Sequence, residues 1–293
     1  MRAPHHAHAE NFVAILDHLG MLRIDGQDTE SFLQGQLSCD VTEIAAGASG
    51  NGAYCSPKGR MLANFLLWRD DKGFAMVLSR DLAGVVQKQL SRYVLRSDVK
   101  ISDASETTVL VGTAGARTDT VLASFPSIRL SDARLLFALP AAVAPGALKG
   151  VQLADSAVWR WLDIRGGQPL ITAATQDQFI PQMANLELLG GVSFEKGCYT
   201  GQEIVARSQH LGKVKRRMFL AHVPVPARAG DRLYSDDLGE QTGGTVLNAE
   251  PSPEGGCDLL AVVQAASRER SAFHLGSPKG PELRFLPLPY AVA

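Results

Sequence analysis

The clearest pattern along the chain is a helical repeat of apolar positions between residues 82 and 93. These positions recur three, four, eight and eleven residues after the first, so they share one side of an α-helix. Polar and charged residues occupy the remaining positions. The segment is therefore predicted to be an amphipathic helix with a core-facing stripe. The stripe consists of Leu82, Val85, Val86, Leu90 and Tyr93.

Short apolar runs on both sides of this helix predict strands. Residues 21–24 indicate a strand, and Asp28 is predicted to cap a short helix that follows it. Two apolar runs within residues 61–78 flank a charged turn at residues 69–73, which predicts a hairpin with a loop longer than two residues. The elements that complete an α+β unit are strands at residues 99–101, 107–112, 128–130 and 135–139, and a helix at residues 118–125.

The pattern changes after a group of proline and glycine residues at 140–150. A helix is predicted near residues 155–164, ended by Gly166 and Gly167. Beyond residue 213, short apolar runs alternate with glycine and proline clusters, a pattern typical of a small β-barrel or sandwich. These runs cover residues 217–223, 244–247 and 259–263.

Composition narrows the function classes without choosing one. The chain has 293 residues, 45% hydrophobic and 20% charged, which is typical of a globular protein of two or three domains. Its net charge of −1 argues against a protein built around broad electrostatic contact with nucleic acid. No apolar run reaches the ~20 residues of a membrane helix, and the first residues do not resemble a secretory signal. We therefore expect a soluble cytoplasmic protein with no membrane partner.

The four cysteines of the chain are Cys39, Cys55, Cys198 and Cys257. Because no two of them form a C-x-x-C pair, their spacing indicates neither a disulfide framework nor a zinc ribbon, and no metal site is predicted. Three of them have surroundings that favour packing in a core. The exception is Cys198, whose neighbours favour reactivity.

The segment from residue 192 to residue 207 combines several local signals. Thr200 and Glu203 have the spacing of a capping box, so a helix is predicted to begin at Thr200. Cys198 then lies just ahead of a helix N-terminus, and Lys196 could add a full positive charge. Both favour a thiolate. The alternative is that Cys198 is a small buried hydrophobic residue and Lys196 faces water.

Residues 196–203, Lys-Gly-Cys-Tyr-Thr-Gly-Gln-Glu, resemble the signature of the YgfZ family of folate-binding proteins. The preceding residues 179–186, Phe-Ile-Pro-Gln-Met-Ala-Asn-Leu, resemble the same family, which is related to the glycine-cleavage aminomethyltransferase. The resemblance extends to residues 32–37 and 58–60. It covers the chain from about residue 20 onward, and the last 80 or so residues match only in pattern.

This resemblance implies an α+β fold of three domains, an aminomethyltransferase-like cloverleaf around a central folate channel. It implies a discontinuous folate-binding domain formed by residues 12–41 and 150–210, an inserted α+β domain at 42–149, and a C-terminal β-barrel at 211–293. It also implies a role in assembling or repairing iron-sulfur proteins. Through one of those enzymes the family is linked to tRNA thiomethylation.

A reduced folate combines a flat pterin, a benzoyl ring and an anionic glutamate tail, so its pocket needs an apolar wall, hydrogen-bond acceptors and a cation. By family position, Trp159 is expected to contact folate. Asp163 is a candidate acceptor for the pterin, and Arg165 is a candidate cation for the tail or a supporting residue. For Trp159, packing in the core is the competing interpretation.

Four further residues complete the predicted folate site. Gln182 and Asn185 can hydrogen-bond the edge of a pterin, or equally can cap the loop at Pro181. Tyr199 and Gln202 are expected to shape the site beside the predicted catalytic pair, Cys198 and Lys196.

One departure from the aminomethyltransferases bears on mechanism. Those enzymes carry an acidic pair soon after a glycine turn, whereas here Gly59 leads into Ala63 and Asn64. An amide cannot take up a proton as a carboxylate does, so Asn64 argues against glycine-cleavage chemistry.

The leading hypothesis is thus a protein that binds tetrahydrofolate and supports iron-sulfur enzymes or cluster-assembly proteins, including a tRNA-thiomethylating enzyme, with Cys198 as a reactive thiol beside the folate. Two alternatives are a folate-dependent aminomethyl or methyl transferase, and a scaffold that binds a cluster through Cys198 shared between chains. The residues alone do not decide whether the protein is an enzyme. The basic run at residues 213–217 is interpreted as a solvated face, so direct tRNA binding is not predicted.

Overall fold

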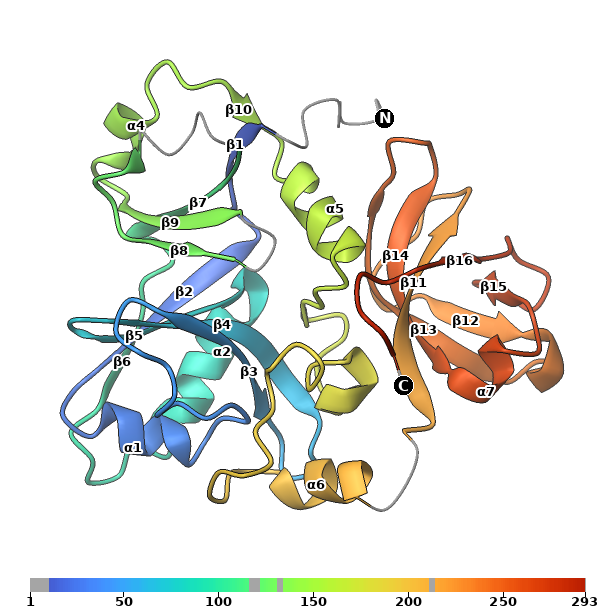
Figure 1. The fold of residues 1–293 in the computed structure, drawn as a ribbon, viewed down its shortest axis with the longest axis horizontal. Helices are drawn as coiled ribbons and strands as arrows, with labels where there is room; N and C mark the ends of the chain where they lie inside the picture. Colours follow the sequence, from blue (N-terminus) through green and yellow to red (C-terminus); the bar gives the residue numbers. More distant parts are fainter. Residues whose placement is uncertain (1–10, 116–121, 131–133, 211–213, 293) are drawn as a thin grey trace.

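The computed structural model describes residues 11–115, 122–130, 134–210 and 214–292. These described residues form three β-sheets with a few short helices around and between them (Figure 1). The α+β class predicted from the apolar pattern is confirmed. No helix in the described ranges is both long enough and apolar enough to cross a membrane.

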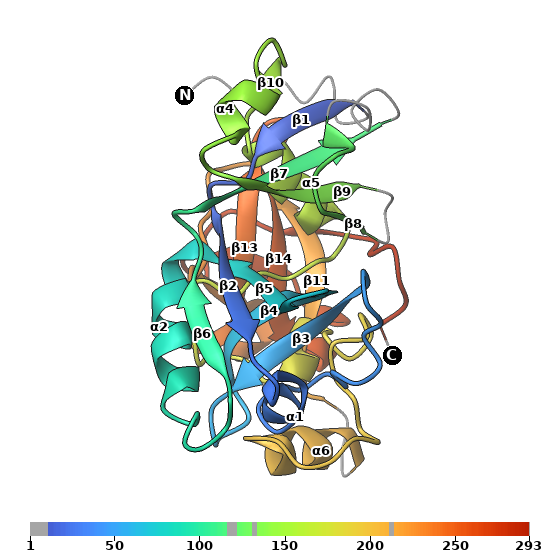
Figure 2. The ribbon, with the colours of Figure 1, turned by 90° about the vertical axis from the view of Figure 1, so that its left-hand side faces the viewer.

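The first sheet has five antiparallel strands in the order β3-β4-β5-β2-β6. Its strands are β2 (Leu19–Asp25), β3 (Ser49–Cys55), β4 (Met61–Asp70), β5 (Gly73–Ser79) and β6 (Lys100–Asp103). The short helix α1 (Thr29–Gln34) follows β2, and the predicted amphipathic helix is α2 (Arg80–Ser91). Figure 2 shows α2 lying against this sheet, where Leu82, Val86 and Leu90 are buried. Val85 and Tyr93 of the predicted stripe are exposed, because the helix rests on the sheet along a narrower strip.

The predicted hairpin at residues 61–78 is present, but its loop is shorter than predicted. Asp70 pairs with Gly73, which leaves two residues in the turn. The strand continues through its charged end because Asp70 accepts hydrogen bonds from the Arg23 guanidinium of β2. Gly73 has φ +138°, and a Cβ there would lie 2.5 Å from the Ile24 carbonyl oxygen, so the tight turn requires glycine.

The second sheet has the strand order β10-β1-β7-β9-β8. Its strands are β1 (Phe12–Ile15), β7 (Thr108–Ala114), β8 (Ser127–Arg129), β9 (Leu135–Pro140) and β10 (Leu153–Ala154). Helix α4 (Ala144–Ala147) follows β9. Strand β10 runs parallel to β1, whereas the other pairs in this sheet are antiparallel. The first half of the helix predicted at residues 118–125 lies outside the described residues.

Strand pairing crosses one of the predicted domain boundaries. Strands β1 and β2 are adjacent in the chain, yet they belong to different sheets. The central position of β2, between β5 and β6, follows from its apolar side chains, since Leu22 and Ile24 are fully buried. The segment 12–41 is therefore shared between two sheets, and the division into residues 12–41 plus 150–210, 42–149 and 211–293 stays a prediction.

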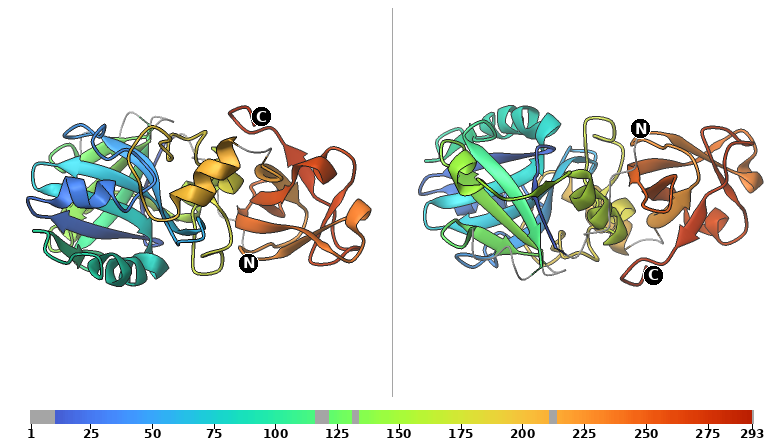
Figure 3. Two further views of the ribbon diagram at one scale, coloured as in Figure 1. Left: turned by 90° about the horizontal axis from the view of Figure 1, so that it is seen from below. Right: turned by 90° about the horizontal axis from the view of Figure 1, so that it is seen from above.

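The third sheet is C-terminal and has the order β15-β12-β13-β14-β11-β16. Its strands are β11 (Arg216–Val223), β12 (Arg232–Ser235), β13 (Thr242–Pro251), β14 (Cys257–Gln264), β15 (Phe273–Leu275) and β16 (Arg284–Leu286). The short helices η2 (Asp236–Leu238) and α7 (Ala265–Arg268) connect its strands. The sheet curls into a half-barrel, seen from below and above in Figure 3. The predicted C-terminal β structure is present as this open sheet, in which the end strands β15 and β16 do not pair with each other.

Helix α5 (Ala157–Arg165) lies between the second and third sheets (Figure 1). It is followed by the short helix η1 (Pro181–Ala184) and by α6 (Gln202–His210), which carries the end of the signature motif. One side of α5 faces the third sheet, where Arg160 pairs with Glu250 and the Trp161 indole N–H donates to Asp258 at 2.9 Å. Its other side buries Trp159 against the second sheet.

The backbone of β7 leaves room for Trp159 only because residue 112 is glycine. A Cβ on Gly112 would lie 2.3 Å from Cε3 of the indole. The ring also meets Phe12 edge-on, with ring centroids 6.3 Å apart. Close packing of α5 on the second sheet thus depends on the absence of a side chain at Gly112, opposite the large indole of Trp159.

We predict that Gly112→Ala lowers the free energy of unfolding by about 1–3 kcal/mol, because the added methyl group overpacks the Trp159 site. Gly84→Ala is the matched control. Gly84 lies in α2 with no atom within 4 Å of an added Cβ, so alanine should be neutral or stabilise by up to ~1 kcal/mol. Urea unfolding measured by circular dichroism compares the two variants, and equal effects would contradict the packing argument.

Candidate functional site

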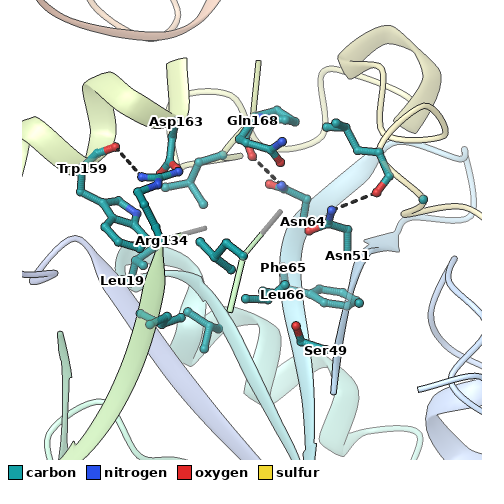
Figure 4. Close-up of a pocket in the computed structure, with 18 of the residues that line it drawn as sticks. Leu19, Ser49, Asn51, Asn64, Phe65, Leu66, Arg134, Trp159, Asp163 and Gln168 are labelled. Carbon is teal, nitrogen blue, oxygen red and sulfur yellow. Dashed lines mark hydrogen bonds and ion pairs between the residues drawn. The ribbon is translucent and has the colours of Figure 1, made fainter. Parts of the chain in front are cut away.

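A cavity of about 420 Å³ lies where the first sheet, the second sheet and α5 meet (Figure 4). Strands β3 and β4 supply Asn51 and Asn64, and β4 adds Phe65. The second sheet and α5 supply the remaining charged and aromatic groups, and residues 168–170 and 189–190 close the rim. A volume of this size is typical of a site for an organic ligand.

Arg134 links the second sheet to α5 inside this cavity. Its guanidinium lies 4.1 Å from the centroid of the Trp159 ring. It donates to the Asp163 carboxylate at 2.5 Å and to the Trp159 carbonyl oxygen at 3.3 Å. The side chain of Arg134 is only 5% exposed. A buried cation is therefore held in place by an ion pair, a hydrogen bond and an aromatic face.

The side chain of Asn64 forms hydrogen bonds within the wall of the cavity. Its Nδ2 donates to the Pro169 carbonyl oxygen at 2.7 Å, and its Oδ1 accepts from the Ile171 backbone N–H at 2.7 Å. Asn51 similarly donates from Nδ2 to the Leu189 carbonyl oxygen at 2.9 Å. The two amides thus fix the rim segments around the opening, and Asn64 provides no proton acceptor of the carboxylate kind.

Two of the seven predicted folate residues, Trp159 and Asp163, line the cavity. Among the described residues that line it, the other five do not occur. Nη1 of Arg165 instead lies 3.7 Å from Oδ2 of Asp258, on the side of α5 that faces the third sheet. Whether any of the seven contacts folate stays a prediction.

Gln182 and Asn185 are fully buried and hold backbone groups together. Gln182 donates from Nε2 to the Val205 carbonyl oxygen of α6 at 2.7 Å. Asn185 has φ +56° and donates from Nδ2 to the Met218 carbonyl oxygen of β11 at 2.8 Å. The segment 179–186 therefore connects the motif helix to the third sheet, and these two bonds are made to α6 and β11 rather than to the loop at Pro181.

Sequence reasoning missed Arg134, Asn51 and Gln168 as cavity residues. Arg134 belongs to no periodic apolar pattern in the sequence. Asn51 lies in a glycine-rich stretch that forms β3. An arginine directly before a predicted strand was the one available signal, and it is weak without a known partner.

The motif helix begins later than predicted. Helix α6 starts at Gln202, so Gly201 rather than Thr200 occupies the position before it. Gly201 has φ +83°, and a Cβ there would lie 2.4 Å from the Ser56 carbonyl oxygen, so close packing on the first sheet fixes this turn. The Glu203 carboxylate accepts from Arg207 at 2.8 Å, one turn along the helix, instead of capping Thr200.

Lys196 is buried, which excludes the alternative in which it faces water. Its Nζ donates to the carbonyl oxygens of Leu37 at 2.8 Å and Cys39 at 2.7 Å, and lies 5.4 Å from the centroid of the Tyr199 ring. Burial lowers the pKa of Lys196. The ammonium group therefore ties the motif loop to the chain after α1. That the Lys196 charge stabilises a Cys198 thiolate stays a prediction.

Cys198 is exposed, which excludes the alternative of a buried hydrophobic residue. The other three cysteines are buried, as predicted. Burial raises the pKa of Cys39 to about 11 and that of Cys55 to about 12. In the part of the chain that the structure describes, no three His, Cys, Asp or Glu side chains are grouped so as to hold a metal ion.

The basic run at residues 213–217 is only partly a solvated face. Arg217 is largely buried, where it pairs with Glu187 and donates to the Gln182 carbonyl oxygen at 2.9 Å. Its charge is therefore used inside the fold, while Lys213 lies outside the described residues.

Comparison with known proteins identifies the family of this chain. Residues 2–152 match the family described as the GCVT N-terminal domain. The tRNA-modifying protein YgfZ of Photobacterium profundum is 32% identical, and the match covers 94% of this chain and 91% of that protein. The chain belongs to the YgfZ family. The YgfZ proteins of Pectobacterium carotovorum subsp. carotovorum and Escherichia coli O7:K1 are 35% and 33% identical, with 94% of this chain covered in both cases.

The fold of this YgfZ family member is that of an aminomethyltransferase. The crystal structure of the glycine cleavage system aminomethyltransferase T from Bartonella henselae superposes with a TM-score of 0.77. The superposition covers 97% of this chain and 87% of that one at 19% identity, so it establishes the fold.

We predict that one thiol of the folded protein reacts rapidly with Ellman's reagent at pH 8, and that all four react after unfolding. The buried thiols react slowly because they are inaccessible and, for Cys39 and Cys55, because their raised pKa keeps them protonated. Cys198→Ser should remove the fast phase. Cys257→Ser is the control and should keep it. A fast phase that survives in Cys198→Ser would disprove this assignment.

Proposed function

We propose that this protein binds tetrahydrofolate in the 420 Å³ cavity and supports the assembly or repair of iron-sulfur enzymes. Through one such enzyme it would act in tRNA thiomethylation, as the name of its relatives, tRNA-modifying protein, suggests. In this proposal the central folate channel of the expected cloverleaf is the cavity between the first two sheets and α5, and Cys198 is the reactive thiol.

The observation that carries the proposal is the chemistry of the cavity lining. Phe65 and several leucines provide apolar walls for the rings of a reduced folate. Gln168 and the rim segments that Asn51 and Asn64 hold in place offer polar groups to the edge of a pterin. Arginines in the lining supply positive charge for the glutamate tail. The residues that line the cavity therefore fit a reduced folate, which would carry a one-carbon group when bound there.

Cys198 supports a thiol role because it is the exposed one of the four cysteines. It lies on the motif loop, which Lys196 anchors to the carbonyl groups of Leu37 and Cys39. A fixed, accessible thiol outside the cavity lining is suited to meet a partner protein. We propose that Cys198 acts on iron-sulfur clients at the surface, while folate occupies the cavity.

A folate-dependent aminomethyl or methyl transferase is the first alternative. It needs a proton acceptor near the folate, and the amide of Asn64 uses both of its polar atoms on Pro169 and Ile171. Among the described residues that line the cavity, the one carboxylate is that of Asp163, which is paired with Arg134. These bonds leave the transferase without its expected acid at this position.

A cluster scaffold is the second alternative. Since Cys39, Cys55 and Cys257 are buried, such a cluster would have to be shared between chains through Cys198. Anaerobic reconstitution that yields a stoichiometric cluster in the wild type, and none in Cys198→Ser, would favour the scaffold over the folate proposal.

We predict that tetrahydrofolate binds the wild-type protein in anaerobic calorimetry and that Trp159→Ala weakens binding by roughly tenfold or more, since it removes a wall of the cavity. Trp161→Ala is the matched control on the same helix, because this indole faces Asp258 instead. The affinity of this variant for tetrahydrofolate should stay within about twofold of the wild-type value. Cys198→Ser should bind normally. If the wild type does not bind reduced folates, the proposal fails.

We also predict no steady turnover when the protein is mixed with tetrahydrofolate and a protein-bound methylamine donor, because Asn64 supplies no proton acceptor. The readout is formation of methylenetetrahydrofolate, with an aminomethyltransferase as the positive control. Sustained product formation by the wild type would replace the binding proposal by the transferase alternative.

A further inference from the structure

Three neighbouring strands of the first sheet place a row of side chains on the face that borders the cavity. Asn51 on β3 pairs directly with Leu66 on β4, and Leu66 pairs with Val77 on β5. Directly paired residues of an antiparallel sheet project to the same face, so these side chains lie side by side. All three line the cavity. The row therefore offers two apolar side chains followed by an amide, which suits a flat ring with a polar edge.

The amide of Asn51 is oriented so that its oxygen is left for a ligand. Its Nδ2 donates to the Leu189 carbonyl oxygen at 2.9 Å. Because a carbonyl oxygen can only accept, this bond determines which way the amide faces. Asn51 is half-buried, and its Oδ1 accepts no hydrogen bond from the residues that the structure describes. The row thus ends in a fixed acceptor, and a ligand group that meets it must be a donor.

Gln168 combines a fixed backbone with an unused carboxamide. Its backbone N–H donates to the Asp163 carbonyl oxygen at 2.8 Å, and the side chains of Asn64 and Asn248 bind the two residues that follow it. The Gln168 side chain lines the cavity and is half-buried, yet it forms no hydrogen bond with any described residue. It therefore presents both a donor and an acceptor to a ligand from a well-held position.

The two amides lie away from the aromatic and charged end of the cavity. Figure 4 shows Trp159 and Arg134 together at one end, while Gln168, Asn64 and Asn51 follow toward the other. Asn64 uses both polar atoms of its amide on the rim segment. The amide atoms that remain for a ligand are therefore Oδ1 of Asn51 and the carboxamide of Gln168.

We propose that Asn51 and Gln168 select the pyrimidine edge of a reduced pterin, whose ring packs with one face on Leu66 and Val77. The inference rests on the proposed function, since it names the residues that recognise the ring of the folate. Oδ1 of Asn51 accepts from the 2-amino group. The Gln168 carboxamide donates to the 4-oxo group and accepts from the ring N–H between these two groups. The ligand class is a 2-amino-4-oxopyrimidine fused to a reduced ring.

The first test changes position 2 of the ligand. 2-Desaminotetrahydrofolate carries hydrogen where tetrahydrofolate carries the 2-amino group, and anaerobic calorimetry measures both with the wild type and Asn51→Leu. We expect the wild type to bind the desamino compound at least tenfold more weakly, because an acceptor in the site is left unpaired. Asn51→Leu should bind the two compounds within about threefold of each other. If the wild-type ratio of affinities persists in Asn51→Leu, the inference is wrong, whatever the absolute affinities.

The second test changes position 4. Tetrahydroaminopterin carries a 4-amino group, a donor, in place of the 4-oxo acceptor of tetrahydrofolate. Gln168→Glu makes the complementary change in the protein, because a carboxylate accepts hydrogen bonds and does not donate them. We expect this variant to shift the ratio of the two affinities at least tenfold toward tetrahydroaminopterin. Gln168→Leu should weaken tetrahydrofolate at least tenfold while leaving urea unfolding unchanged, since its side chain forms no hydrogen bond within the described structure.

Gln178→Glu is the control for added charge. Gln178 lies on the same segment between α5 and η1, but it is exposed and does not line the cavity, so the ratio of the two affinities should stay at the wild-type value. Equal losses for both ligands in Gln168→Glu would mean that Gln168 only shapes the rim. That result would overturn the inference while leaving the folate proposal intact. No binding of tetrahydrofolate by the wild type would overturn both.

Discussion

The burial of Trp159 against Gly112 determines where α5 lies, and the cavity depends on that position. The indole enters the second sheet where β7 has no side chain, so the helix approaches closely at this point. The helix then faces the third sheet with its other side, through Trp161 and Asp258. Because the first sheet packs on the same cluster through Trp68 and Val77, one large side chain sets the spacing of the walls around the cavity.

Buried charges specify this arrangement more than they stabilise it. Arg134 pairs with Asp163 on one side of α5, and Arg160 pairs with Glu250 on the other. A partly buried ion pair gains little net free energy, because desolvation offsets its attraction. A rotated or shifted α5 would leave one of these charges without its partner, which is costly. The pairs therefore select one register of the helix between the two sheets.

Much of the secondary structure was predictable from the sequence, because it follows from local apolar periodicity. The stripe that includes Leu82 and Leu90 gives α2, and the two apolar runs at residues 61–78 give the β4–β5 hairpin. The hairpin loop was predicted too long, because Asp70 reads as a turn residue until its partner Arg23 on β2 is known. Such long-range partners carry no local signal.

The candidate site was predictable only where a residue carries its own signal. Exposed Cys198 falls in the signature motif, and cavity-lining Trp159 was expected from family position. Arg134 gains its significance from Asp163 and Trp159, which lie 29 and 25 residues away in the chain. Gln182 and Asn185 have the chemistry of ligand contacts, yet their amides bind backbone carbonyls of Val205 and Met218. Residue type alone does not distinguish these two uses of an amide.

Strands β1 and β2 belong to different sheets, and this has a consequence while the chain is being synthesised. All five strands of the first sheet end at or before residue 103, so they can pair once this residue has left the ribosome. Strand β1 is made earlier, but its partners are β7 and β10, and the latter ends at Ala154. At about 5–20 residues per second, this apolar strand waits for several seconds without a partner. Its length of four residues limits the edge that it offers to other chains during that time.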